Sequence, residues 1–153
     1  MSSGKIDFVK NPDLTQLQNE PSLIDEVGKF LGEGLVRENF AEHQLRRIHS
    51  ELIRLNKLAA SLRAYADTVP REQITELKRG LVKLSYITTY QHARQGPRKN
   101  KSIDNYFNLM KNLVTKLMDS PEPHKYIELV FNVSESIIAY YNFIKEMERE
   151  RYG

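Results

Sequence analysis

The sequence lacks cysteine and tryptophan, and it has no long hydrophobic run. Without cysteine the chain forms no disulfide and holds no metal through thiolates, which is compatible with a reducing compartment. The N-terminus, MSSGKIDFVK, lacks the apolar segment of a signal peptide, and no apolar stretch is long enough to cross a bilayer. We therefore expect a cytoplasmic protein that does not enter a membrane.

Motifs of catalysis and of cofactor binding are also missing. The sequence contains no H-E-x-x-H, E-x-x-H, P-loop or G-x-G-x-x-G pattern. The four histidines form no recognisable metal-ligand motif: His43, His49, His92 and His124. We therefore predict no enzyme activity, no metal site and no cofactor, and a protein that acts by binding.

Apolar residues recur at steps of three and four along five segments, which is the pattern of helices with one buried face. The predicted helices cover about 22–37, 41–66, 70–95, 102–120 and 124–149. The last has the widest apolar arc, so we expect it to be central. These features predict an all-α fold, a compact bundle of about five helices in a single domain over residues 22–153, preceded by a flexible N-terminal tail over residues 1–21.

Glycine is concentrated in the first predicted helix, at Gly28, Gly32 and Gly34. Each costs roughly 1 kcal/mol relative to alanine in a helix interior. The glycines follow no strand, so they do not predict a phosphate-binding loop. They are compatible with close helix contact or with a bend.

Positive charge is concentrated in the middle of the chain, although the net charge is only +3. Residues 71–101 carry eight Lys or Arg against two Glu, whereas residues 1–40 carry four against seven Asp or Glu. This asymmetry favours an acidic partner, with nucleic acid first among the candidates. The alternative is an ordinary solvated surface.

Two predicted helices present basic stripes opposite their buried faces. With about 100° per residue, Arg79, Lys83 and Arg94 share a band of roughly 80° with Tyr86 and Tyr90. The preceding helix repeats the arrangement with Arg47, Arg54 and Lys57, and a basic loop follows at Arg98, Lys99 and Lys101. Lys and Arg bind phosphates, and exposed Tyr stacks on unpaired bases, so the pattern favours nucleic-acid binding.

Three segments resemble the small subunit of type III-A CRISPR effector complexes, the Csm complexes. They are residues 44–48 (QLRRI) with Glu51, Leu52 and Arg54, residues 83–86 (KLSY), and residues 136–143 (SIIAYYNF). The segments occur in the family's order, and the resemblance runs from about residue 23 to the C-terminus. The chain departs from the family at Tyr90, where the family has Arg, at Asn142, where it has Lys, and at Ile53, which replaces a basic residue.

The resemblance implies a noncatalytic, RNA-binding subunit of an antiviral defence complex. Several copies would stack into an inner filament, contact other subunits and line the channel that holds crRNA and target RNA, while nuclease and cyclic-oligoadenylate activities belong to other subunits. The basic residues then neutralise phosphates, because guide pairing supplies the sequence recognition. The expected RNA-facing residues are Arg46, Arg47, Arg54, Lys57, Arg79, Lys83, Arg94 and Arg98. The alternatives are the small subunit of the type III-B complex and a helical protein–protein adaptor without RNA binding.

Overall fold

The computed structural model describes residues 3–65, 68–96 and 100–152, and these residues form helices joined by short turns. Five helices correspond to the five that the sequence predicts: α3 (Ser22–Arg37), α4 (Glu42–Arg63), α5 (Arg71–Ala93), α6 (Lys101–Asp119) and α7 (Pro123–Tyr152). Two further helices precede them, α1 (Ser3–Lys10) and α2 (Leu14–Asn19). The all-α prediction is therefore confirmed, but the described residues contain seven helices instead of about five.

Within residues 1–21, which were expected to form a flexible tail, residues 3–10 and 14–19 are helical. Four side chains of α1 and α2 are buried: Phe8, Val9, Leu14 and Leu17. Asp13 caps α2 by accepting a hydrogen bond from the backbone N–H of Thr15 at 2.8 Å. Helices of six and eight residues are too short to be stable alone or to show a clear hydrophobic period. They form here because they pack on α3, α6 and α7.

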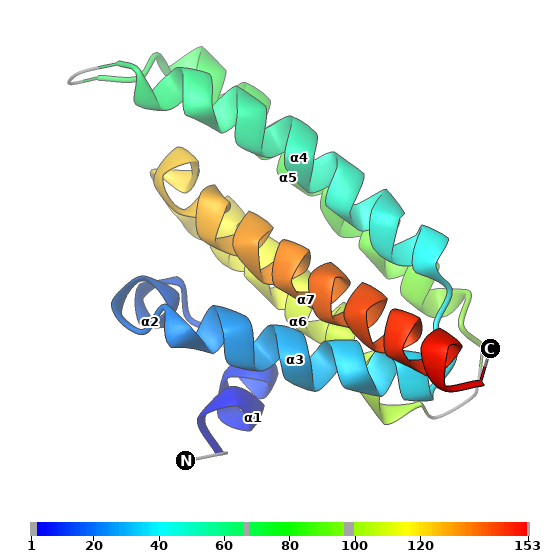
Figure 1. Ribbon diagram of the computed structural model, residues 1–153. Helices are drawn as coiled ribbons and strands as arrows, with labels where there is room; N and C mark the ends of the chain where they lie inside the picture. Colours follow the sequence, from blue (N-terminus) through cyan, green and yellow to red (C-terminus); the bar gives the residue numbers. More distant parts are fainter. Residues whose placement is uncertain (1–2, 66–67, 97–99, 153) are drawn as a thin grey trace.

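The longer helices are arranged in three layers, which Figure 1 shows from the side. The antiparallel pair α4 and α5 forms one outer layer, α6 and α7 form the middle layer, and α3 with the two short helices forms the other side. α7 packs against α2, α3, α4, α5 and α6. The prediction that the last helix is central is therefore confirmed.

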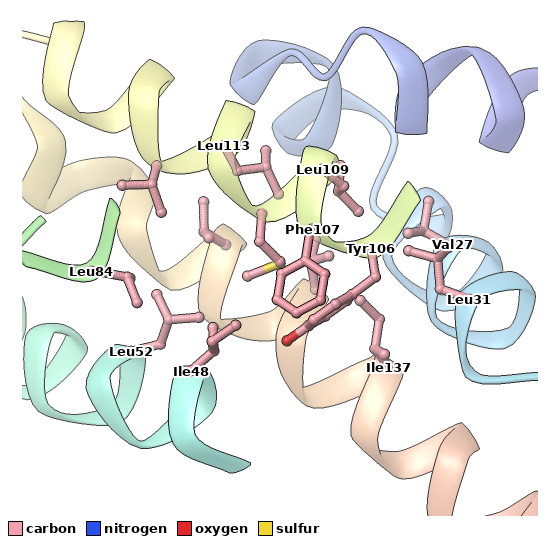
Figure 2. Packing of buried hydrophobic residues seen from close by; sticks show 14 of the residues in the cluster. Val27, Leu31, Ile48, Leu52, Leu84, Tyr106, Phe107, Leu109, Leu113 and Ile137 are labelled. Atoms are coloured by element: carbon pink, nitrogen blue, oxygen red, sulfur yellow. The ribbon is translucent and has the colours of Figure 1, made fainter. Parts of the chain in front are cut away.

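One continuous hydrophobic cluster joins the three layers into a single domain. Figure 2 shows its middle, where Phe107 and Tyr106 of α6 lie between the side chains of the outer layers. Ile48 of α4, Leu31 of α3 and Ile137 of α7 are all fully buried there. The buried side chains recur every three or four residues along each helix, as the sequence pattern indicated.

The glycines of α3 permit close helix contact. A Cβ added to Gly28 would lie 2.7 Å from the Cβ of Ser136, and one added to Gly32 would lie 2.8 Å from the Cβ of Tyr140. Carbon atoms in ordinary contact are about 3.5–4.0 Å apart. The absence of side chains at Gly28 and Gly32 therefore sets the distance between α3 and α7.

The start of α6 is capped from a distant part of the chain. Ser102 lies inside the helix and its side chain is buried, so this serine does not cap α6. The backbone N–H groups of Ser102 and Ile103 instead donate to the two carboxylate oxygens of Glu38, at 2.8 and 2.9 Å. A carboxylate at this end also interacts favourably with the helix dipole. The turn after α3 is thereby tied to α6.

Candidate nucleic-acid interface

The candidate interface is the outer face of α4 and α5. These helices run antiparallel and side by side, and both are visible along one edge of the molecule in Figure 1. Gly80 of α5 lies against Leu55 of α4: a Cβ at this glycine would be 2.3 Å from the leucine Cδ2. The missing side chain at Gly80 thus leaves room for Leu55, and the polar flanks of the two packed helices lie on one shared surface.

Two shallow hollows lie between the polar flanks of α4 and α5. The first hollow has a volume of about 250 Å³ and is lined by His43, Gln44, Arg47, Tyr90, Gln91, Arg94 and Gln95. The second hollow has a volume of about 440 Å³ and is lined by Arg54, Leu58, Glu76, Arg79, Gly80, Val82, Lys83 and Tyr86. Both hollows are lined by basic side chains of α4 and of α5 or its C-cap Arg94, and each contains one tyrosine.

Five of the eight basic residues selected from the sequence line these hollows. Arg47 and Arg94 line the first, and Arg54, Arg79 and Lys83 line the second. All five are exposed. The structure thus brings together, on one face, residues that are up to 47 positions apart in the chain.

The other three selected residues are not part of this cluster. Arg46 and Lys57 are exposed on α4, but they line neither hollow. Successive helical residues are about 100° apart, so Arg46 points away from the flank that carries Arg47. Arg98 lies outside the described residues.

Acidic neighbours reduce the positive charge of the second hollow more than that of the first. Arg79 pairs with Glu76 at 3.2 Å, and Arg54 pairs with Glu51 at 3.0 Å. Exposed pairs at this helical spacing contribute only about 0.3–0.5 kcal/mol, so an incoming phosphate can replace the glutamate. The residues that line the first hollow include no carboxylate. The charge of Arg47 and Arg94 is therefore not offset within the first hollow.

A cluster of glutamines in the first hollow was missed by the sequence analysis. Gln95 donates from Nε2 to Oε1 of Gln44 at 2.6 Å, which links the end of α5 to the start of α4. Gln91 lies beneath them, only 5% exposed, and its Oε1 has no hydrogen-bond partner within the described residues. Uncharged polar residues at helix ends give no periodic signal, so only the packing of the two helices identifies them.

Two histidines hold the α4–α5 pair on the middle layer. The His49 ring stacks on Phe131 of α7 with 5.0 Å between centroids, and its Nδ1 is 2.9 Å from the hydroxyl of Ser134. His92 of α5 is bound in the same way to α6, where its ring stacks on Phe107 and its Nε2 is 2.9 Å from the carboxylate of Asp104. These contacts fix the orientation of the two basic helices and leave their outer face open.

Burial lowers the pKa of His49, since a positive imidazolium is poorly solvated between α4 and α7. Burial also lowers the pKa of His124, at the start of α7. Both rings are therefore neutral at physiological pH. Within the described residues, no three His, Asp or Glu side chains are placed to hold a metal ion.

The class of protein follows from the fold and from this face: an all-helical bundle that presents paired basic helices. None of its described helices is long and apolar enough to cross a membrane.

The family model for Csm2 Type III-A matches residues 18–147, which include all of α3 to α6 and most of α7. The chain therefore belongs to the Csm2 Type III-A family and is a small subunit of a type III-A CRISPR effector complex. No curated protein and no solved structure was found to match it. The resemblance noted in the sequence is thus confirmed.

Proposed function

We propose that this subunit binds RNA through the outer face of α4 and α5, without cleaving it and without reading its sequence. The observation that carries the proposal is the convergence of Arg47, Arg54, Arg79, Lys83 and Arg94 on two adjacent hollows of one face. Cationic side chains from two antiparallel helices form a continuous site for an extended polyanion, because each helix supplies contacts along its length. Phosphates are the same in every RNA, so these contacts add affinity and no sequence preference.

The site has a positioning role in this proposal and no catalytic one. Lysine and arginine are protonated at neutral pH, so they stabilise phosphate charge but do not supply a base that activates the 2′-hydroxyl. RNA incubated with the protein, with or without divalent metal, is expected to stay intact. Metal-dependent cleavage that one point substitution in this chain abolishes would contradict this part of the proposal.

Membership of the effector complex supports the assignment of crRNA and target RNA as the bound polyanions. We place several copies of the subunit side by side in an inner filament, with the basic face of each copy toward the RNA channel. In this arrangement guide–target pairing selects the sequence, and the subunit holds the RNA by its backbone.

The direct test is a titration of the full-length protein with labelled single-stranded RNA. The informative variant is Arg47→Ala/Lys83→Ala, which removes one cation from each hollow. The matched control is Lys116→Ala/Lys145→Ala, which removes the same charge from exposed positions on α6 and α7. We expect the first pair to weaken binding several-fold and the control pair to leave it unchanged.

Equal binding by both double variants would show that only net charge matters, and it would refute the assignment of this face. No RNA binding by the wild-type protein, either alone or in the complex, would favour the protein–protein adaptor instead.

A further inference from the structure

Two tyrosines stand out on the basic face. Tyr86 and Tyr90 are 61% and 56% exposed, and neither hydroxyl makes a hydrogen bond within the described residues. By contrast, the hydroxyl of Tyr140 donates to Asp25 at 2.6 Å, and that of Tyr141 donates to the carbonyl of Phe40. The two exposed rings are four residues apart on α5, so they project from the same side, about 6 Å apart along the helix axis.

Each of these rings lies among cations. Tyr86 lines the second hollow with Arg54 and Lys83, and Tyr90 lines the first hollow with Arg47 and Arg94. The guanidinium carbon of Arg94 is 5.7 Å from the centroid of the Tyr90 ring, which is within the range of a cation–π contact. An aromatic face next to a phosphate-binding side chain is the arrangement by which proteins hold unpaired nucleotides, with the base on the ring and the backbone on the cation.

We propose that Tyr86 and Tyr90 are a stacking platform for unpaired nucleobases, so that this face prefers single-stranded RNA with accessible bases to other polyanions. The inference rests on the RNA-binding function proposed above and specifies its ligand. Stacking is tolerant of base identity because every base has a π face, so the platform is compatible with a sequence-independent subunit.

The surroundings of the rings favour a nucleic acid over a protein partner. The centres of protein–protein interfaces are depleted of charged residues. Here cationic side chains flank both rings, and Val82 and Leu58 are the apolar neighbours in the second hollow. Alternating rings and cations match the alternation of bases and phosphates along a single strand.

The lack of tryptophan in the chain makes a direct test possible. Tyr86→Trp and Tyr90→Trp each place a single tryptophan at the platform and keep an aromatic ring there. The probes are a 20-nucleotide single-stranded RNA and an abasic oligonucleotide of the same length, which has the phosphates but no bases. The control variant is Phe143→Trp, because Phe143 is similarly exposed, at 58%, but lies on α7 beside α3.

We expect the RNA to quench the fluorescence of both platform variants and the abasic strand to quench neither, with no quenching at position 143. In parallel, Tyr86→Leu and Tyr90→Leu should weaken RNA binding by about 5- to 150-fold each, the range that corresponds to the loss of one stacked base. Tyr86→Phe and Tyr90→Phe should bind as the wild type does. The salt dependence should be the same for all four, because stacking releases no counterions.

The outcomes separate this inference from the proposed function. If RNA and the abasic strand bind equally and no quenching occurs, the stacking platform is wrong while the phosphate-binding face stands. If Leu and Phe variants bind alike, aromaticity is irrelevant and the inference is equally refuted. If neither strand binds to the wild-type protein, the proposed function fails and the platform fails with it.

Discussion

Substituting Gly32 with alanine tests most sharply how α3 and α7 are held together. In an exposed helix this change would stabilise the protein by about 1 kcal/mol, because alanine is the better helix former. At Gly32 the new methyl group would lie 2.8 Å from the Cβ of Tyr140 and 2.9 Å from the backbone nitrogen of Tyr141. Neither atom can rotate away from the methyl group, so the two helices must separate.

The size of the effect follows from this separation. Restoring an ordinary carbon–carbon contact requires the helices to move apart by roughly 1 Å, and a gap of that size removes a quarter to a half of each dispersion contact along the seam. Overpacking of this kind typically costs 1–3 kcal/mol. After subtracting the gain in helix propensity, we expect a net loss of up to about 2 kcal/mol and a Tm lower by up to about 8 °C.

Chemical denaturation of Gly32→Ala, monitored by circular dichroism, measures this loss. Gly4→Ala is the matched control, because no atom would lie within 4 Å of its added Cβ, and it should not destabilise the protein. Gly28→Ala/Gly32→Ala should cost less than the two single variants together, since one separation relieves both clashes. If Gly32→Ala stabilises the protein as a surface substitution would, the close packing of α3 on α7 is refuted.

Three further predictions concern the core and its polar groups. Ile137→Ala should lower the free energy of unfolding by about 2–5 kcal/mol, because Ile137 is fully buried at the centre of α7, and a loss well under 1 kcal/mol would place α7 at the periphery. Tyr106→Phe should be neutral or stabilising, because the buried Tyr106 hydroxyl has no hydrogen-bond partner in the described residues. Tyr141→Phe should cost about 1 kcal/mol, because it loses the hydrogen bond from the Tyr141 hydroxyl to a backbone carbonyl. Equal effects of the two substitutions in denaturant unfolding would contradict both assignments. The pKa of His49 is lowered in the folded state. At a pH below about 6.5, the ordinary pKa of histidine, the unfolded state therefore binds more protons than the folded state. The free energy of unfolding should therefore be at its full value above this pH and decline as the pH falls toward the folded-state pKa of His49. Between pH 7 and 5, the free energy of unfolding of His49→Gln should decline less than that of the wild type.

The five long helices could be predicted because each has a buried stripe that repeats every three or four residues. Breaks such as Gly96 and Pro70 then delimit them: Pro70 directly precedes α5, and Gly96, with a φ of 78°, follows its end. The short helices of residues 3–19 could not be found in this way, since one or two turns show no period. The cap on α6 could not be predicted either, because Glu38, which accepts a hydrogen bond from the N–H group of Ser102, is 64 residues away from it in the chain.

The candidate site was predictable in part for a related reason. A spacing of three, four or seven residues places Arg79 with Lys83, and Arg47 with Arg54, on one stripe of each helix. The sequence does not indicate which flank of α4 faces α5. That flank carries Arg47, which lines the first hollow, and not Arg46. The pairing of Gln44 with Gln95 likewise depends on how α4 and α5 pack, which the sequence does not indicate.

The central claim is that the α4–α5 face binds RNA phosphates. Its most direct test is the salt dependence of target-RNA binding by the assembled effector complex, measured with two unrelated guide–target pairs. Lys83→Ala and Arg47→Ala should each weaken binding by similar factors for both pairs, and each should make the log–log salt slope shallower by about 0.7 to 0.9, while Lys145→Ala and Lys116→Ala change neither quantity. The claim is contradicted if all four variants bind alike, or if the effect of either site variant depends on the target sequence.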